Sequence, residues 1–534
     1  MERYIKVSIN ERVSVCAIKA SAKSGFSDYK KSMLGLPQNI FSLAACTPEW
    51  VTLQMVDETV GVKVDWNTKA EIIVIMFHTP DAIRGYEIAD KFKRMGKTVV
   101  LGGLHTTFMQ EEALEHAHSI LIGECEGIWE ELLNDYLSVR LKNKYERNTI
   151  FDLASLSPYP TDILPTELYD YSWTVTVSRG CPNKCSYCTV HKFFPKYRKR
   201  PIEDIVKEIK NAPTDFIELK ADNLTVDRDY SMKLFKALEP LNIVWMTALE
   251  PEFAEDKELV QAAARSGMRN ILLGIETPSR EALKENNKGQ LKLDKLKEDI
   301  EYLHSFDIEI DSAMLFGFDN HDKNIFRETL EFALDIDIDI THGVIPIPFP
   351  GTELYKSLER DGRLTTKDWS KYDGSWLVFK HENFNVMDLY NGVMWYESEF
   401  NKRHNIRDFK WHHRWDNDSF NYDEETKKYI MGGTGTYKKK DQSYADYKSN
   451  PKKIKWKTIL AILMVTAGIM LDLPILFGLL YIFWAILDIK TGHAYIIEDI
   501  SRHEHPILFW IIVTLWMISG LYVFINALFT NWLY

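Results

Sequence analysis

Cysteine is scarce in this sequence, and the few cysteines are unevenly spread. Six occur in 534 residues, which is too few for the disulfide framework of a small secreted domain. Three of the six stand alone, whereas Cys181, Cys185 and Cys188 fall within eight residues. Clustering of this kind in a large, cysteine-poor chain favours a metal site in a reducing compartment.

The chain also has no excess of positive charge and no secretion signal at its beginning. Its net charge is −12, whereas general nucleic-acid binders usually carry a basic field, so we expect no nucleic-acid partner. Residues 1–15 are charged and contain no apolar run of the kind that a signal peptide needs. Hydrophobic residues make up 45% and charged residues 27%, which excludes a mainly disordered or collagen-like chain.

Long uncharged runs are confined to the end of the chain. Residues 458–471 and 473–487 carry no charged side chain, and the uncharged run 506–534 is long enough to cross a bilayer. Four lysines within 452–457 would place the large N-terminal part in the cytoplasm. We therefore expect two or three transmembrane helices over 456–534, and a multi-pass membrane protein. A buried helical core is the alternative for the shorter runs.

Strand-like and helix-like stretches alternate through the first 150 residues. Short apolar runs at 71–77, 98–103 and 119–124 are typical of buried parallel strands, and amphipathic stretches lie between them. The alternation predicts an α/β fold with a doubly wound, Rossmann-like sheet over 1–150. Ligands of such sheets lie beyond the carboxyl ends of the strands. The polar and glycine residues that fall there are Gly102, Gly103, His105, Gly123 and Glu124.

A second α/β series follows from about residue 170. Its apolar runs predict six strands, at 173–178, 216–221, 243–248, 271–276, 309–316 and 342–347. Strand–helix units at this spacing predict a parallel barrel or partial barrel over 165–350, with functional residues at the C-terminal strand ends. We expect residues 351–410 to cap the barrel and the polar residues 411–455 to form a linker.

The three clustered cysteines directly follow the first barrel strand. Their spacing is Cys181-x3-Cys185-x2-Cys188, and three thiolates on one loop can hold three irons of a 4Fe–4S cube. Most electron-transfer clusters have four cysteine ligands, so the fourth iron here is open to a chelating ligand. Structural zinc, with His191 as a fourth ligand, and isolated thiols are the alternatives. Zinc is less favoured because such sites usually have paired CxxC spacing.

The sequence CPNKCSYC resembles the signature of radical S-adenosylmethionine (SAM) enzymes. The resemblance implies a partial (βα)6 TIM-like barrel, a 4Fe–4S cluster whose open iron is chelated by SAM, and reductive cleavage of SAM to a 5′-deoxyadenosyl radical. It also implies SAM contacts at Tyr187 in the signature, in LKADN after the second strand, and at the end of the fourth strand. Those further candidates are Lys220, Asp222, Asn223 and Glu276. For the carboxylates, a helix N-cap or a surface position is the alternative.

The segment from VVLGGLHTTF to GECEGIWEELL resembles the cobalamin-binding domain of one large branch of these enzymes. The resemblance implies that cobalamin is bound by Thr79, Gly102, Gly103, His105, Gly123 and Glu124. The segment IPFPGTELYKSLERDGRL also resembles this branch. One departure is that the Asp-x-His-x-x-Gly motif, whose histidine coordinates cobalt in many cobalamin proteins, is absent. The alternative interpretation is therefore a domain that no longer binds cobalamin.

These features together predict a membrane-anchored radical SAM enzyme that modifies an unactivated carbon. The favoured reaction is cobalamin-dependent methylation of a lipid or other hydrophobic small molecule, with an electron donor such as a ferredoxin or flavodoxin. The cofactors would perform the difficult chemistry, while the protein orients them and excludes water. Radical cyclisation, oxidation or carbon–carbon coupling without methyl transfer is the first alternative. A membrane-bound redox or cobalamin sensor is the alternative from another functional class.

Overall fold

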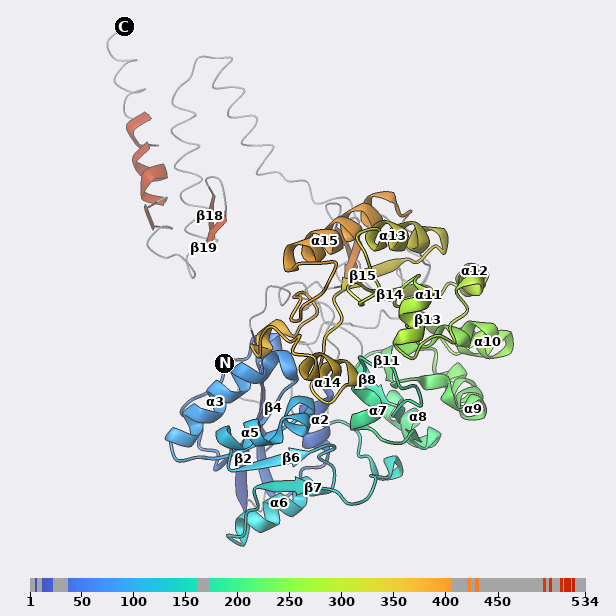
Figure 1. Ribbon diagram of the computed structural model, residues 1–534. Helices are drawn as coiled ribbons and strands as arrows, with labels where there is room; N and C mark the ends of the chain where they lie inside the picture. Colours follow the sequence, from blue (N-terminus) through green and yellow to red (C-terminus); the bar gives the residue numbers. More distant parts are fainter. Residues whose placement is uncertain are drawn as a thin grey trace. The chain divides into compact units, whose positions relative to one another are not determined.

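The computed structural model divides the chain into two compact units, 1–441 and 442–534. Each unit is described by itself (Figure 1). The residues that the structure describes are 5–6, 12–22, 37–160, 173–405, 407, 409, 420–423, 428–431, 493–495, 499–501, 510–511, 513–519 and 521–523.

The first unit opens with a mostly parallel sheet. Among the described residues the strand order is β1-β3-β2-β4-β5-β6-β7, and only β1 runs antiparallel to its neighbour. The strands are β1 (Ile5–Lys6), β2 (Val13–Lys19), β3 (Val51–Asp57), β4 (Ile72–Met76), β5 (Thr98–Gly102), β6 (Ser119–Ile122) and β7 (Lys144–Glu146). Every residue of β4 is buried, as in a parallel strand that is covered on both faces. The Rossmann-like prediction is confirmed.

Helices connect these strands, and the strand order defines the topological switch point of the sheet. The chain passes from β2 to β3 on one side and then crosses to β4 on the other side of β2, so the switch point lies between β2 and β4, where open α/β sheets bind ligands. The helices are α2 (Gln38–Ala45), α3 (Ala82–Arg94), α4 (Leu104–Phe108), α5 (Gln110–His116) and α6 (Ile128–Leu137).

The second half of the first unit is a parallel sheet whose six strands follow chain order. Its strands are β8 (Trp173–Thr176), β11 (Phe216–Lys220), β12 (Val244–Leu249), β13 (Met268–Leu273), β14 (Glu309–Leu315) and β15 (Ile340–Val344). No pairing joins β8 to β15 in the described part of the chain, so these strands form an open six-stranded barrel. Each overlaps one of the six predicted strands, although β13 and β15 begin two or three residues earlier than predicted.

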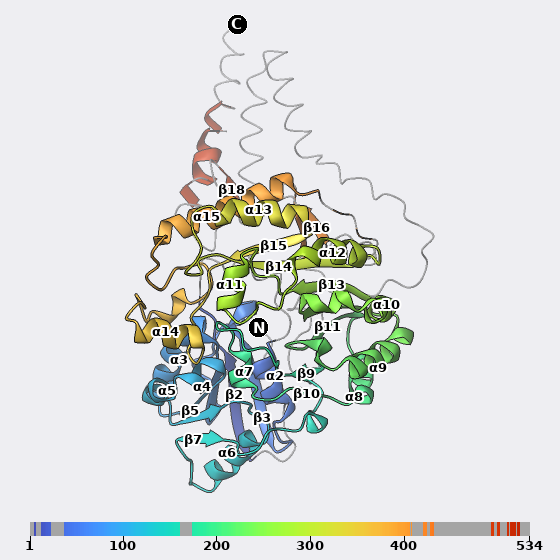
Figure 2. The ribbon, with the colours of Figure 1, turned by 45° about the vertical axis from the view of Figure 1, so that its right-hand side comes forward.

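The barrel helices lie outside the strands (Figure 2). They are α8 (Ile202–Lys210), α9 (Arg228–Leu238), α10 (Lys257–Arg265), α12 (Leu296–His304) and α13 (Ile325–Asp335). The short helix α11 (Arg280–Glu285) instead packs near Tyr187, Leu315 and Phe318. Asp227 and Asp256 cap two of the outer helices, because each carboxylate accepts a backbone N–H of the first turn. The buried face of each outer helix packs on the strands, which leaves the carboxyl ends of the strands for the connecting loops.

Residues 351–410 contact both halves of the first unit. Helix α14 (Glu353–Arg360) opens this segment, and α15 (Val386–Arg403) packs beside β15, where Tyr396 Oη lies 2.8 Å from Thr341 Oγ1. Trp369, between these helices, instead donates its indole N–H to Glu112 of the N-terminal domain at 2.8 Å. The segment that we expected to cap the barrel therefore also ties it to the N-terminal sheet.

The prediction of transmembrane helices over 456–534 is contradicted. In the described residues, no helix is both long and apolar enough to cross a bilayer. The prediction of a multi-pass membrane protein with a cytoplasmic N-terminal part is overturned by the same finding.

Most of the predicted linker 411–455 and of the predicted spans lies outside the described residues. Two antiparallel strand pairs are described in this part of the chain. They are β16 (Phe420–Asp423) with β17 (Lys428–Met431), and β18 (His493–Tyr495) with β19 (Asp499–Ser501).

Candidate functional site

The three clustered cysteines lie on a loop at the carboxyl end of β8. The short strand β9 (Ser178–Arg179) leads into this loop and pairs antiparallel with β10 (Arg198–Lys199) beyond it. Gly180, between β9 and the first cysteine, has a φ of +94°, and a Cβ added there would lie 2.4 Å from the carbonyl oxygen of Lys196. Only glycine fits this position without strain. The cluster loop, residues 181–188, therefore begins at a tightly fixed point.

Asp222 also holds the beginning of the cluster loop. Its carboxylate accepts the backbone N–H of Gly180 at 2.7 Å, and burial raises its pKa although this hydrogen bond partly offsets the effect. Its neighbour Asn223 is buried and hydrogen-bonds the Cys181 side chain, which opposes the rise in the pKa of that thiol. Two of the residues predicted after the second barrel strand thus contact the loop, whereas Lys220 pairs with Glu218 at 2.9 Å.

The thiols of the cluster loop lie in a weakly solvated environment. Burial raises the pKa of Cys185 to about 12 and that of Cys188 to about 11, and it also raises the pKa of Cys181. Cys188 adds to the pKa of Cys185, and Cys181 adds to the pKa of Cys188, so the three thiols lie near one another. Without metal the group is protonated, and binding of iron would supply the positive charge that stabilises thiolates.

The arrangement of the three sulfurs fits a cluster of several iron atoms rather than a single metal ion. In the described residues, no group of three or more His, Cys, Asp or Glu side chains is arranged to hold a single metal ion. Each thiolate ligand of a 4Fe–4S cube binds a different iron, so the three sulfurs need not converge on one point. The donor set, three cysteines on one loop, fits such a cube with one open iron.

A buried charged triad lies beside the cluster loop. The ammonium of Lys288 is 2.7 Å from Glu276 Oε1 and 3.1 Å from Glu250 Oε2. Burial would lower the pKa of Lys288, but Glu276 and Glu250 together raise it, so the side chain is charged. Gly274 leaves room for the ammonium, since a Cβ there would lie 2.6 Å from Lys288 Nζ. The triad carries one net negative charge, which suits a cationic ligand.

The predicted aromatic residue of the signature faces the same triad. Tyr187 packs against Phe318 with ring centroids 5.9 Å apart, and its pKa is raised by burial and next by Glu276. Glu276 has a φ of +70°, a conformation that is costly outside glycine and is often found at functional sites. The structure thus brings Tyr187 and Glu276 together with the cysteines. Sequence reasoning missed Glu250 and Lys288, because their pairing joins separate strands and loops.

The predicted residues of the N-terminal sheet form two groups. In the first, His105 is fully buried, with Nδ1 3.2 Å from Thr79 Oγ1 and Nε2 3.3 Å from Glu112 Oε1. Gly103 has a φ of +103°, and a Cβ there would lie 2.5 Å from the carbonyl oxygen of Phe77. Gly102 and Gly103 therefore allow close packing between the ends of β4 and β5, and both ring nitrogens of His105 have protein partners.

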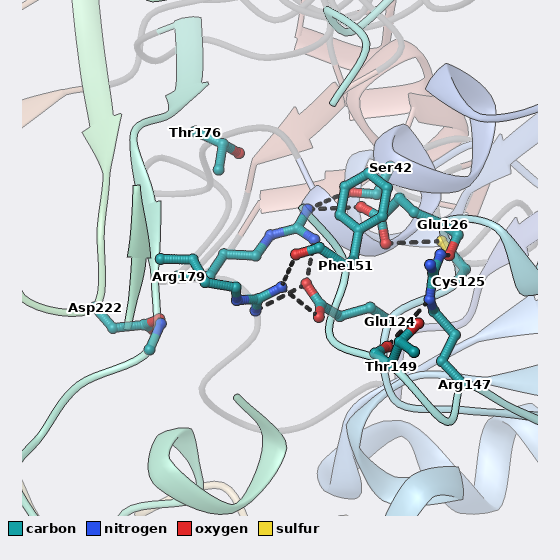
Figure 3. A network of polar contacts seen from close by, with 12 residues as sticks. Ser42, Glu124, Cys125, Glu126, Arg147, Thr149, Phe151, Thr176, Arg179 and Asp222 are labelled. Atoms are coloured by element: carbon teal, nitrogen blue, oxygen red, sulfur yellow. Dashed lines mark hydrogen bonds and ion pairs between the residues drawn. The ribbon is translucent and has the colours of Figure 1, made fainter. Parts of the chain in front are cut away.

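The second group lies after β6, where the loop contacts the barrel. Gly123 has a φ of +75°, and its N–H donates to Thr107 Oγ1 at 2.9 Å. Glu124 extends toward the barrel and pairs with Arg179 at 2.6 Å and Arg198 at 2.8 Å (Figure 3). These partners could not be predicted from local sequence, because they lie more than fifty residues away from Glu124.

The carboxyl ends of the two sheets face each other. His78 follows β4 at the switch point, and its pKa is lowered to about 4 by desolvation and next by Lys19. Lys220, at the end of β11 in the barrel, also lowers this pKa, so it lies near His78. A ligand at the switch point of the N-terminal sheet would therefore face the strand ends that carry the cluster loop.

The sequence matches known proteins over the region that contains this site. Residues 175–333 match the model of the radical SAM superfamily. Bacteriochlorophyllide d C-8(2)-methyltransferase of Chlorobaculum tepidum is 30% identical over 362 residues, which cover 64% of this chain and 80% of that protein. The C-12(1)-methyltransferase of the same organism is 26% identical over 65% of this chain and 78% of its own length.

Two solved structures share the fold at low sequence identity. The radical SAM methyltransferase TsrM from Kitasatospora setae, with cobalamin and a [4Fe-4S] cluster bound, has a TM-score of 0.54 and 14% identity, over 65% of this chain and 75% of that one. The cobalamin-dependent radical enzyme OxsB with aqua-cobalamin has a TM-score of 0.51 and 16% identity, over 74% and 62%. At these identities the likeness shows the fold alone.

The sequence matches decide between the alternatives for the cysteine loop. The matched family region contains all three cysteines, the triad, the end of β8 and the strands β11 to β14. An enzyme with a 4Fe–4S cluster and SAM as cofactors is therefore confirmed, and zinc is not supported. On the match across the barrel, and on the identity to a relative that is covered over most of its length, the chain belongs to the radical SAM superfamily.

Proposed function

We propose that this protein is a cobalamin-dependent radical SAM methyltransferase. The observation that carries the proposal is the ion pair at 2.6 Å between Glu124, in the loop after β6 of the N-terminal sheet, and Arg179, in the strand that leads into the cluster loop. A cobalamin at the switch point would lie across from SAM on the cluster loop. Several similar proteins are named as methyltransferases, and two solved neighbours contain cobalamin.

The residues of the barrel fit binding and orientation of SAM. Cys181, Cys185 and Cys188 would hold the cluster, which supplies one electron that breaks the S–C5′ bond of SAM to give methionine and a 5′-deoxyadenosyl radical. The net negative triad of Glu250, Glu276 and Lys288 would attract the cationic sulfonium and amine of SAM. Asp222 and Asn223 hold the start of the loop, and Tyr187 with Phe318 limits access of water. A ferredoxin or flavodoxin is the proposed source of the electron.

The N-terminal residues fit a flat ligand held at a strand edge. Gly123 has no atom within 4 Å of an added Cβ, so a ligand can approach the backbone at the end of β6. Gly102 and Gly103 let Met76 and Phe77 pack closely at the end of β5 and so shape the same edge. Thr79, His105 and Glu124 would hold the backbone at this edge in place through the hydrogen bonds and ion pairs described above. In this proposal they are the cobalamin-side residues, and cobalt would have no ligand in an Asp-x-His-x-x-Gly motif.

The proposed substrate is a hydrophobic small molecule with an unactivated carbon. The relatives with this architecture are named for bacteriochlorophyllide d and, at 25% identity over 299 residues, for a hopanoid. Radical chemistry without methyl transfer is the second candidate, because an anaerobic magnesium-protoporphyrin IX monomethyl ester cyclase of Cereibacter sphaeroides is 27% identical over 331 residues. That match covers 53% of the cyclase, against 80% of the C-8(2)-methyltransferase, which favours methyl transfer.

Anaerobic reconstitution tests the proposal. The full chain is supplied with iron, sulfide and hydroxocobalamin, then with SAM and titanium(III) citrate, and both 5′-deoxyadenosine and S-adenosylhomocysteine are measured. We expect both products, because a methyltransferase uses SAM in two ways. Replacement of any one of the three loop cysteines by Ala should reduce 5′-deoxyadenosine by at least ~100-fold, since loss of a residue that merely supports a metal ligand already costs ~10–100-fold and here a ligand itself is removed.

The lone buried Cys16 of β2 provides the matched control. Cys16→Ala also removes a buried thiol but lies outside the barrel, so cluster content and product formation should stay unchanged. Formation of 5′-deoxyadenosine without any S-adenosylhomocysteine would favour radical chemistry without methyl transfer. Cluster binding without either product would contradict the proposed use of SAM.

A further inference from the structure

The loop after β6 presents two carboxylates to the barrel. This loop, residues 123–127, lies between Gly123 at a φ of +75° and Gly127 at a φ of +84°. A Cβ on Gly127 would lie 2.1 Å from Arg147 Nη1, and this nitrogen donates to the Glu126 carbonyl oxygen at 2.8 Å. The two left-handed glycines and this hydrogen bond fix the loop so that Glu124 and Glu126 both extend toward the barrel (Figure 3).

Arg179 of the barrel receives both carboxylates. Its Nη1 donates to Glu124 Oε1 at 2.6 Å and its Nη2 donates to Glu126 Oε1 at 2.7 Å. The Nη2 group also lies 3.3 Å from Ser42 Oγ in α2. Burial alone would lower the pKa of Arg179, but Glu126 leads the interactions that raise it. The planar guanidinium can reach two carboxylates at once, which a lysine ammonium does less well.

A second arginine strengthens the same junction. Arg198 Nη1 donates to Glu124 Oε2 at 2.8 Å and to the Phe151 carbonyl oxygen at 2.8 Å. The guanidinium groups of Arg179 and Arg198 lie 5.8 Å and 5.7 Å from the ring centroid of Phe194. Arg179 lies on β9 and Arg198 lies on its partner strand β10. The loop 123–127 therefore forms ion pairs with both strands that flank the cluster loop.

The position of Arg179 in the chain connects this junction to the cysteines. Gly180 and Cys181 follow it directly, and the Gly180 N–H is held by Asp222 of the barrel at 2.7 Å. The first cysteine therefore lies two residues from a side chain that is bound to the N-terminal domain. A displacement of the loop 123–127 would move the start of the cluster loop with it.

Stability alone is a weak reason for such a network. Burying an ion pair costs desolvation energy, and a well-packed apolar replacement is often as stable or more stable. Here four charged side chains, each at most 12% exposed, meet between two domains. An arrangement of this kind specifies one relative geometry of the two domains rather than merely holding them together.

We propose that Arg179 is a positioning residue that sets the distance between the cluster loop and the ligand edge of the N-terminal sheet. This inference rests on the proposed function, in which SAM gives its methyl group toward the N-terminal domain. The two fates of SAM depend differently on this distance. Reductive cleavage needs only the barrel, whereas methyl loss to reduced cobalamin needs the acceptor, which supplies the electron pair for the new bond, to lie in line with the S–CH3 bond that breaks.

The test uses Arg179→Lys and Glu126→Gln in the reconstituted full chain, with SAM, hydroxocobalamin and titanium(III) citrate as probes. A misplacement of about 1 Å between reacting groups can cost ~100-fold in rate, so S-adenosylhomocysteine per cluster should fall at least ~10-fold. Formation of 5′-deoxyadenosine per cluster should stay within about threefold of wild type. The electron paramagnetic resonance signal of the reduced cluster should be unchanged.

Arg200 and Glu208 provide matched controls. They form a buried ion pair, 1% and 5% exposed, inside the barrel, so Arg200→Lys and Glu208→Gln disturb a similar pair without touching the N-terminal domain. The ratio of the two products should not change in these controls. Equal ratios in all four variants, or losses of both products in proportion to lost cluster, would overturn the proposal.

A failure of the proposed function has a different signature. If wild type forms 5′-deoxyadenosine but no S-adenosylhomocysteine, methyl transfer is wrong, and hydrogen exchange then decides the role of Arg179. Faster exchange in both 123–127 and 178–188 in Glu126→Gln, but not in Glu208→Gln, supports positioning of the cluster loop. Exchange that stays unchanged in the cluster loop contradicts it.

Discussion

At the scale of single residues, the site depends on charges whose partners lie far apart in the sequence. Lys288 is 3% exposed and lies between Glu250 and Glu276, yet nothing in its local sequence distinguishes it from an exposed lysine. The cysteines were predictable because their spacing is short and local. Glu250, Lys288 and Arg179 were not, since burial and long-range pairing give them their roles.

Lys288→Met should destabilise the protein and weaken SAM binding. Removing one partner of a buried ion pair typically costs about 3–5 kcal/mol, and here it leaves two carboxylates facing each other. Urea unfolding of the apo protein and the KM for SAM are the measurements. Lys292→Met is the control, because Lys292 is 55% exposed in its pair with Glu255 and such pairs contribute at most about 1 kcal/mol. Equal effects of both substitutions would contradict the role of the triad.

Acidification should destabilise the apo protein through His321. This side chain is 2% exposed, its Nδ1 accepts the Gly317 N–H at 3.3 Å, and burial lowers its pKa from 6.5 to about 4. The unfolded state binds the proton first, so stability is full above pH ~6.5 and is lost as the pH falls toward ~4, by roughly 3 kcal/mol. Urea unfolding across this range should show a weaker pH dependence in His321→Gln. An unchanged slope would rule out His321 as the cause.

At the scale of elements, fully buried strands were the most predictable parts of the fold. The strands β4, β5 and β6 are short, mainly apolar runs, because both faces of a parallel sheet are covered. The barrel strands include polar residues, as in EIDSAML and ITHGV, but recur at regular spacing. The strands β2 and β3 escaped prediction, since VSVCAIK and VTLQMVD mix polar with apolar residues. The turn between β9 and the cluster loop was likewise invisible, because it depends on contact with Lys196.

Gly180→Ala should prevent the cluster loop from forming correctly. The φ of +94° and the 2.4 Å approach to the Lys196 carbonyl oxygen leave no room for a Cβ, so we expect reduced iron per chain after reconstitution. Gly61→Ala is the matched control, because Gly61 has a φ of +82° but no atom within 4 Å of the added Cβ. It bears only the conformational cost of about 1 kcal/mol. Equal iron content in the two variants would show that the contact with Lys196 is unimportant.

At the scale of the whole molecule, domain contacts and the C-terminal residues were least accessible from sequence. Uncharged runs over 456–534 predicted membrane spans, and that prediction is wrong, because no helix among the described residues is both long and apolar enough to cross a bilayer. The junction of Glu124 and Glu126 with Arg179 could not be predicted either. It depends on how distant segments are arranged in space rather than on local pattern.

The contact of Trp369 with Glu112 has a consequence for the modularity of the chain. Glu112 also holds His105 inside the N-terminal sheet, so a residue that follows the barrel in sequence completes the interior of a domain that precedes it. The boundary near residue 150 is therefore not a point at which the protein can be cut and recombined. A functional exchange of the N-terminal domain with that of a relative would have to carry Trp369 and its neighbours along with residues 1–150.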